Sequence, residues 1–188
     1  MLIFPEIATP RALREQVVAM QDWAWPRGDG TTSTTAPIHD PALRPLSMLL
    51  VEEGRVLSAL DILSKDLTHA GQRFAASGVS TMVTDEAQRG KGFGRTLIEA
   101  AKDEMGSGGA DLGIFTCDAP LRSFYEHGGF AVLPGTVLVG GTRNEPFPSN
   151  LFDKVTLAAF FSERAKLAAA SFEHARVGLY PGSIDKLW

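Results

Sequence analysis

A glycine-rich turn between a strand and a helix carries the clearest chemical signal in the chain. Gly90, Gly92 and Gly94 stand at alternate positions, after a run with strand character (76–84) and at the start of a run with helical character (93–105). The first turn of a helix has N–H groups without internal partners and the positive end of the helix dipole, so an anion is favoured there. Three side chains add positive charge around the same turn: Arg89, Lys91 and Arg95. These residues predict a site for a diphosphate.

The spacing of the turn decides between kinds of phosphate loop. Lys91 is followed by Gly92 rather than by Ser or Thr, so the Walker pattern and its magnesium ligand are missing, and the third glycine comes one residue too early for Gly-x-Gly-x-x-Gly. The pattern Gln/Arg-x-x-Gly-x-Gly/Ala fits the segment 89–94, which Gln88 precedes. This segment resembles the loop with which N-acetyltransferases of the GNAT superfamily hold the pyrophosphate of acetyl-CoA. A glycine-rich connection without a ligand is the alternative.

A second pattern follows the next predicted strand. In the segment 118–130, Pro120 stands near the start of a short helix, and Gly128 and Gly129 stand at its end, where the chain turns into an apolar strand. The run Phe124-Tyr125-Glu126-His127-Gly128-Gly129-Phe130 resembles the other hallmark of the GNAT superfamily, Leu/Phe-Tyr-x-x-x-Gly-Phe. Two separate motifs, in the expected order and local structure, support the same resemblance.

The resemblance implies where acetyl-CoA binds. In GNAT enzymes the pantetheine arm enters a splay between the fourth and fifth strands, where backbone groups hold it. The cofactor site implied for this chain comprises the end of the fourth strand, the glycine turn and two positions in the second motif: Met82, Val83, Gln88, Arg89, Gly90, Lys91, Gly92, Phe93, Gly94, Arg95, Asp118 and Phe124. Acetyl transfer ejects a thiolate, which the hydroxyl of Tyr125 can protonate.

Two alternatives remain open at this site. Tyr125 could be a core residue whose hydroxyl reaches water. Cys117, at the end of a buried strand, could carry the acetyl group covalently, although buried cysteines mostly fill space.

A base for the acceptor amine is harder to find in the sequence. The positions that face the site near the end of the fourth strand are Ser80, Met82 and Thr84, and none is a carboxylate. The last four residues, 185–188, resemble the end of the aminoglycoside 2′-N-acetyltransferases, whose terminal carboxylate lies in the acceptor site. This resemblance implies that Trp188 supplies an indole wall and a carboxylate ligand or base, and Asp185 a second negative charge. A tail without a role is the alternative.

A long segment near the amino terminus is expected to complete the acceptor site. Residues 23–37 are rich in Gly, Pro and Thr, which forbids a regular element, and loops of this length in compact domains are usually functional or disordered. Trp23 and Trp25 are therefore candidates to cover the substrate, together with Ser80 on the fourth strand. Packing of both indoles on the core is the alternative.

The remaining patterns indicate an α+β fold. A helix is expected from Thr9 as cap and Pro10 as first helical residue to about Trp23. Strands follow at 46–52, 55–65 and 72–84, the first two joined by the hairpin turn Glu53-Gly54. A strand at 111–117 should run parallel to its predecessor, because a helix connects them. Later elements are a strand from Phe130, strands at 137–141 and 154–161, a Pro-containing loop at 142–150, and a helix at 162–175 capped by Ser162.

These elements agree with the GNAT fold that the resemblance implies. We expect one domain spanning 1–188, with a mixed, mostly antiparallel central sheet that has a V-shaped splay between strands 4 and 5 and is flanked by helices. A stripe of mostly small residues in the last helix, 165–172, is expected to pack on the sheet; covering the acceptor groove and a contact between two copies in a homodimer are the alternatives.

Composition limits the partners and the compartment. The 188 residues carry a net charge of −4 and no basic cluster beyond the glycine turn, so nucleic acid is not expected and a small cationic amine is tolerated. The amino terminus lacks the basic flank of a signal peptide, no apolar run reaches the length of a membrane span, and Cys117 is the only cysteine. We therefore expect a cytoplasmic protein. The histidines lack metal-ligand spacing, so no metal is expected.

These observations predict an acetyl-CoA-dependent N-acetyltransferase in which the amine attacks directly, with Tyr125 and Trp188 as catalytic residues. The preferred acceptor is an amino sugar of the aminoglycoside type, kasugamycin included, which would make the protein an antibiotic-resistance enzyme. A protein amino terminus or a polyamine is the alternative acceptor. A module that senses acetyl-CoA without turnover is the alternative from another class.

Overall fold

A seven-stranded sheet organises the chain. The computed structural model describes residues 1–26 and 38–188, and most of the predicted loop lies outside this range. The strands follow the order β1-β2-β3-β4-β5-β9-β6, with these bounds: β1 (Leu2–Pro5), β2 (Leu46–Glu52), β3 (Arg55–His69), β4 (Gln72–Thr84), β5 (Leu112–Asp118), β9 (Lys154–Phe160) and β6 (Ala131–Val132). A second, three-stranded sheet has the order β10 (Arg176–Gly178), β7 (Val137–Gly141) and β8 (Pro146–Pro148).

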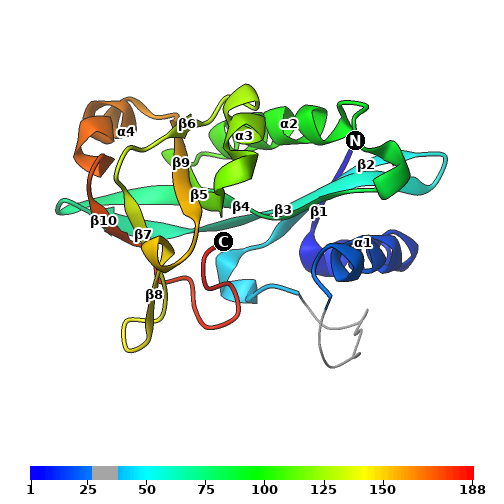
Figure 1. Ribbon diagram of the computed structural model, residues 1–188, viewed down its shortest axis with the longest axis horizontal. Helices are drawn as coiled ribbons and strands as arrows, with labels where there is room; N and C mark the ends of the chain where they lie inside the picture. Colours follow the sequence, from blue (N-terminus) through cyan, green and yellow to red (C-terminus); the bar gives the residue numbers. More distant parts are fainter. Residues whose placement is uncertain (27–37) are drawn as a thin grey trace.

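Helices cover both faces of the large sheet. Figure 1 shows α2 (Phe93–Ser107), α3 (Arg122–His127) and α4 (Glu163–Ala168) on one face, and α1 (Arg11–Ala24) on the other. The sheet is antiparallel except between β4 and β5, which α2 connects as a crossover. The predicted mixed sheet flanked by helices is therefore confirmed. Within the described ranges, no helix is long and apolar enough to cross a lipid bilayer.

The core has one apolar cluster on each face. On the α2 face, Leu97, Ile98, Ala101 and Met105 turn one side of the helix onto the sheet and are buried. On the α1 face, Val17 packs with residues of β2, β3 and β4, among them Val83. A fully buried Leu or Ile contributes roughly 1.5–3 kcal/mol, so the two clusters hold the sheet rigidly between helices.

Two tight hairpins connect β2, β3 and β4. Glu53 and Gly54 both have positive φ, as do Ala70 and Gly71 in the second hairpin. This geometry is typical of the two-residue turns that suit the twist of antiparallel strands. β3 continues to His69 and is longer than the predicted 55–65, because Leu67 keeps the buried side of the alternation going.

The start of α1 differs from the prediction. The helix begins at Arg11, Pro10 is its N-cap, and no side chain caps it. The hydroxyl of Thr9 is buried without a hydrogen-bond partner. Thr9 is therefore not the cap, because the proline occupies that position.

Three strands and one helix end were not predicted. β1 pairs with β2 at the edge of the large sheet, and β8 lies within the expected loop at 142–150. The prolines of β8 are tolerated because it is an edge strand. The last helix ends at Ala168 rather than near residue 175, and a 3₁₀ turn carries Phe172 into the core before β10 joins β7. Ser162 caps α4 as predicted.

Candidate active site

The two parallel strands separate soon after they meet. β4 and β5 pair at only two positions, Ala76 with Leu112 and Ser77 with Gly113. Beyond these pairs the strands no longer form a ladder, which leaves a gap between the rest of β4 and the rest of β5. The predicted splay between strands 4 and 5 is confirmed.

Trp188 occupies the start of this gap. Its indole Nε1 donates a hydrogen bond to the carbonyl oxygen of Ile114 on β5 at 2.8 Å. On the β4 side, a Cβ atom added to Gly78 would lie 2.4 Å from the same nitrogen. The side chain is buried, and Figure 1 shows the C-terminal end of the chain beside the middle of the sheet. The structure thus places Trp188 at the start of the gap, and its predicted role in the acceptor site stays a prediction.

The glycine turn forms a hollow at the head of α2. Gly90 and Gly92 have φ of 77° and 86°, and a Cβ atom added to either would meet no atom within 4 Å. Glycine is favoured here both because φ is positive and because the open backbone can approach a ligand. The hollow has a volume of about 270 Å³. Its lining consists of the turn and its neighbours: Thr84, Gln88, Arg89, Gly90, Gly92, Phe93, Gly94, Arg95 and Phe124.

Gly94 joins the turn to the rest of the site. A Cβ atom there would lie 3.1 Å from Thr84 Oγ1, 3.2 Å from Met82 Cε and 3.4 Å from a ring carbon of Phe124. A side chain at this position would therefore push α2 away from β4 and α3. Thr84 at the end of β4 and Phe124 of the second motif therefore line the hollow together with the glycine turn.

The basic side chains of the turn are close to the hollow. Arg89 places its guanidinium 4.5 Å from the ring centre of Trp23, and Lys91 donates to Gln88 Oε1 at 2.8 Å. Arg95 pairs with Glu99 one helical turn further along. These residues, together with the N–H groups of the first turn of α2, fit a diphosphate.

Tyr125 lies on the other side of the gap, on α3. Its ring is buried and packs edge-on against Phe115 of β5 and against Phe124. Burial raises the pKa of the phenol well above its usual value, and the nearby Cys117 and Asp118 raise it further. The phenol therefore stays protonated and can donate a proton.

Cys117 is poorly suited to carry an acetyl group. Burial, followed by the charge of Asp118, raises the pKa of its thiol to about 11. Because the thiolate is the nucleophile, this environment disfavours the covalent alternative. Asp118 itself is exposed and pairs with Lys154 of β9 at 2.6 Å.

A buried ionic cluster lies on the α1 side of the sheet, and only Asp185 among its three residues was predicted from the sequence to belong to the site. The ring of His39 contacts Asp185 Oδ1 through Nδ1 at 2.6 Å and Asp61 Oδ2 through Nε2 at 3.3 Å. Asp61 also accepts hydrogen bonds from Ser47 at 2.5 Å and from Thr81 at 2.7 Å. We call His39, Asp61 and Asp185 the acidic cluster. Its side chains are almost fully buried.

His39 is an imidazolium in this cluster. Burial alone would lower its pKa, but the hydrogen bonds and the charges of Asp185 and Asp61 outweigh burial and raise the pKa to about 10. One signal in the sequence could have revealed the cluster: Asp61 stands within the otherwise apolar core segment of β3, where a carboxylate needs partners.

The remaining predicted acceptor residues are spread over the site. Trp23 belongs to the last turn of α1 and contacts the glycine turn through Arg89, and the indoles of Trp23 and Trp25 are about half exposed. Ser80 is partly buried on β4 and pairs with Asp61 in the strand register. Both carboxylate oxygens of Asp185 are engaged, by His39 and by the N–H of Asp40. Asp185 can therefore act on a substrate mainly through its charge.

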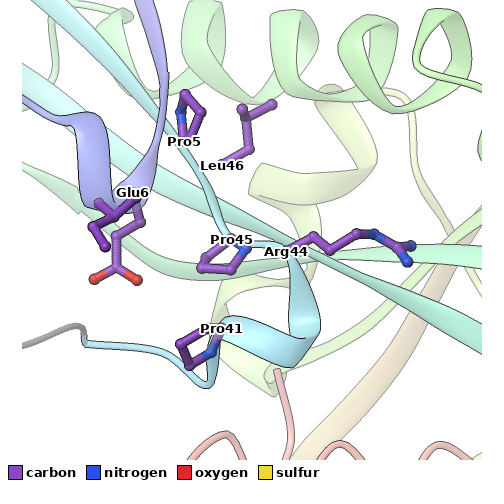
Figure 2. Close-up of a pocket in the computed structure, with 7 residues that line it drawn as sticks. Pro5, Glu6, Pro41, Arg44, Pro45 and Leu46 are labelled. Atoms are coloured by element: carbon purple, nitrogen blue, oxygen red, sulfur yellow. The ribbon is translucent and has the colours of Figure 1, made fainter.

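A larger groove, of about 330 Å³, lies elsewhere and differs in chemistry. Figure 2 shows it between the rings of Pro5, Pro41 and Pro45, with Glu6 beside them. The Glu6 carboxylate forms an ion pair with Arg14 and accepts a hydrogen bond from the backbone N–H of Ile38. Glu6 therefore helps to hold the chain before His39, and the predicted site residues lie at the gap and the glycine turn rather than in this groove.

An open mixed sheet with an anion-binding turn beside the gap and a protonated phenol across it defines an acetyl-transferring enzyme. The chain belongs to the GNAT acetyltransferase family, because the family described as acetyltransferase (GNAT) domain matches residues 11–133. The matched span includes α1, the glycine turn and Tyr125. Among curated protein sequences, none matches the chain.

Solved structures of similar fold include several N-acetyltransferases. An acyl-CoA N-acyltransferase from Pseudomonas aeruginosa has a TM-score of 0.57 at 15% identity and covers 84% of this chain and 96% of its own. An aminoglycoside 6′-N-acetyltransferase complexed with coenzyme A has a TM-score of 0.59 at 13% identity, with 87% and 99% covered. The aminoglycoside 6′-N-acetyltransferase from Enterococcus faecium has a TM-score of 0.57 at 14% identity, with the same coverage. These similarities confirm the predicted GNAT fold.

Proposed function

We propose that this acetyltransferase moves the acetyl group of acetyl-CoA to a primary amine of a small cationic amino sugar. The observation that carries the proposal is the opposite charge on the two faces of the sheet at the gap. The glycine turn offers N–H groups and basic side chains on the α2 side, while the acidic cluster lies on the α1 side. An anionic cosubstrate and a cationic acceptor can therefore approach each other from opposite faces of the sheet.

The glycine turn fits the diphosphate of coenzyme A. The backbone N–H groups at the start of α2 and the side chains of Arg89, Lys91 and Arg95 would hold it. Gly90 and Gly92 leave the approach open, since neither has a neighbour where a Cβ atom would stand. Met82 and Val83 lie on the strand that runs along the gap, where their backbone groups would hold the pantetheine arm.

Acetyl-CoA supplies the acetyl group as an activated thioester. Tyr125, kept protonated by its burial, would give a proton to the sulfur that leaves, and the proton that the attacking nitrogen loses on forming the amide would return to Tyr125 through water. Trp188 would close the start of the gap and form a wall against the acceptor. The net formal charge of the acidic cluster is −1, from two carboxylates and one imidazolium, and it would attract the cationic amine.

Two similarities support an aminoglycoside as the acceptor. Solved structures of similar fold include aminoglycoside 6′-N-acetyltransferases, and the segment 185–188 resembles the end of 2′-specific enzymes. We therefore favour the 2′-amine of an aminoglycoside, kasugamycin being an atypical member of the class. A polyamine or a protein amino terminus is the alternative acceptor.

The experiment follows thiol release and product mass on mixing the protein with acetyl-CoA and a set of amines. Kanamycin A and kanamycin B are a matched pair, because they differ only in a hydroxyl or an amine at the 2′ position. We expect transfer to kanamycin B and not to kanamycin A. Equal transfer to both would contradict 2′ specificity, and transfer only to spermidine or a peptide would contradict the sugar acceptor.

Binding of coenzyme A is measured separately by calorimetry. Binding of coenzyme A without thiol release in the presence of any amine of the set would indicate a sensory module instead of transfer. Absence of binding would contradict the whole proposal.

A further inference from the structure

A bulge in β4 puts Thr81 into an unusual conformation beside the gap. From Ala59 to Asp61 β3 advances by two residues, while their partners on β4, Val83 and Ser80, are three residues apart. One extra residue is therefore accommodated on β4, and Thr81 there has a φ of 47°. A β-branched residue rarely adopts this left-handed conformation, and such residues persist where the surrounding structure holds them, often at functional sites.

The hydroxyl of Thr81 is fixed by the acidic cluster. It donates its only proton to Asp61 Oδ2 at 2.7 Å. His39 Nε2 lies 3.5 Å from the Thr81 oxygen and closer, at 3.3 Å, to Asp61. A hydroxyl oxygen has two lone pairs, so one acceptor position remains even where the Nε2–H of His39 approaches the other, and the oxygen has no proton left to donate. The side chain is partly buried and retains an exposed surface.

The charge around Thr81 favours a cation. The acidic cluster has a formal charge of −1 when His39 is an imidazolium. Glu6, which accepts a hydrogen bond from the backbone N–H of His39, is itself paired with Arg14. Buried negative charge that water screens poorly would therefore draw an ammonium group to Thr81, and the amine would release one proton to water before its nitrogen attacks the thioester.

Thr81 also lies between the two halves of the proposed site. Gly78, three residues earlier on β4, receives the indole of Trp188, and Met82, the next residue, contacts Gly94 of the glycine turn. The side chain of Thr81 contacts Asp61 and that of Met82 contacts α2, so these consecutive side chains lie on opposite faces of the sheet.

We propose that Thr81 positions the acceptor amine: its oxygen, kept free of a proton toward the gap by Asp61, accepts a hydrogen bond from the amine N–H. The inference rests on the proposed function and assigns the residue that recognises the substrate's nitrogen. The inference also explains why β4 needs no carboxylate at the site. The carboxylate of Asp61, on the neighbouring strand β3, acts on the amine through the hydroxyl of Thr81.

The test compares Thr81→Val with Thr81→Ser, using acetyl-CoA with kanamycin B, kasugamycin and spermidine as probes. Valine keeps the branched shape and removes the hydroxyl, while serine keeps the hydroxyl. Loss of one hydrogen bond to a charged group predicts that kcat/KM for the amine falls roughly tenfold to hundredfold in Thr81→Val. We expect unchanged binding of acetyl-CoA and recovery of most of the activity in Thr81→Ser.

Ser64→Ala is the matched control, because Ser64 and Ser77 form a hydroxyl pair at 2.8 Å between the same two strands. It removes an interstrand hydroxyl away from Thr81 and should leave transfer unchanged. Thr81→Gly is a second variant without the hydroxyl, and it should fold even if Thr81→Val does not, because glycine tolerates positive φ. It should keep or raise the melting temperature and still lose transfer as Thr81→Val does.

The outcomes separate the inference from the proposed function. If the wild-type protein transfers acetyl to none of the probes, both the proposed function and this inference are contradicted. If the wild-type protein is active and Thr81→Val or Thr81→Gly matches it in kcat/KM for the amine, only the inference is overturned. A loss in Thr81→Val that Thr81→Ser does not restore also overturns it.

Discussion

The indole N–H of Trp188 donates to the carbonyl oxygen of Ile114 at 2.8 Å, although 74 residues separate them in the chain. Ile114 is the first residue of β5 beyond the two pairs with β4. Its carbonyl has lost the neighbouring strand that would normally supply an N–H, and a buried carbonyl without a partner costs free energy. Trp188 thus replaces a strand at the point where the sheet opens.

This relationship predicts a graded loss of stability on substitution of Trp188. Trp188→Ala removes a buried ring and should lower the free energy of unfolding by about 3–5 kcal/mol. Trp188→Phe keeps most of the volume and leaves the Ile114 carbonyl without its donor, so a loss of about 1–3 kcal/mol is expected. Urea denaturation measures both. Trp25→Phe is the control, since Trp25 is half exposed and should change stability by less than about 0.5 kcal/mol.

The same substitutions distinguish the proposed role of Trp188 beside the acceptor from a role in binding coenzyme A. Acetyl transfer should fall in Trp188→Phe and fall further in Trp188→Ala, while calorimetry should show unchanged binding of coenzyme A at the glycine turn. Wild-type stability and transfer in Trp188→Phe would contradict a role for the indole in the gap.

Tyr125→Phe should lower turnover and leave binding nearly unchanged. The change removes one oxygen from a buried ring that packs against Phe115 and Phe124, and a positioned general acid contributes roughly 10²- to 10⁴-fold in rate. Steady-state kinetics should therefore show a fall in kcat with a similar KM. Because burial holds the pKa of the phenol above its usual value, ionisation of Tyr125 should not reduce transfer until the pH exceeds the range usual for tyrosine.

Tyr180→Phe is the control for this prediction, since Tyr180 stacks with Arg143 away from the gap. It should keep wild-type turnover. Equal kcat in wild type and Tyr125→Phe would remove the proton-donor role and leave Tyr125 as a core residue.

The parts of the site that were predicted from the sequence are local in the chain. The glycine turn and the run from Phe124 to Phe130 each contain their chemistry within a few consecutive residues, so spacing alone identifies them. β4 was predicted with its bounds because a hairpin turn starts it and the glycine turn ends it.

The parts that were missed depend on contacts between distant segments. His39 meets Asp61 across 22 residues and Asp185 across 146, and no periodicity links these positions. The bulge at Thr81 is also invisible in the sequence, because a threonine there gives no sign of positive φ. The short strands β8 and β10 form only because β7 lies between them.

Gly92→Gln should abolish binding of coenzyme A and leave the fold intact. The side chain would fill open space at the head of α2, where the diphosphate is proposed to lie. A residue other than glycine at this φ costs roughly 1–2 kcal/mol, which is small beside the stability of a domain. Gly71→Gln is matched to it, because Gly71 also has positive φ and open surroundings but lies in the β3–β4 hairpin.

Calorimetry with coenzyme A should therefore separate the two variants, which should have similar melting temperatures. Binding by Gly92→Gln as tight as by Gly71→Gln would place the diphosphate elsewhere.

His39→Gln should destabilise the protein in a way that depends on pH. Removing the imidazolium leaves Asp61 and Asp185 as neighbouring buried carboxylates, and breaking a buried ionic pair costs about 3–5 kcal/mol. The pKa of His39 is raised from 6.5 to about 10, so the stabilisation by its charge is fully present below pH 6.5, declines as the pH rises above it and is lost above about pH 10. Urea denaturation of both proteins across this range should show their difference in the free energy of unfolding shrinking toward alkaline pH.

The exposed His127 provides the control His127→Gln, which should match the wild type throughout. A difference between His39→Gln and wild type that stays constant from pH 6 to pH 10 would show that the two carboxylates do not hold His39 as a cation.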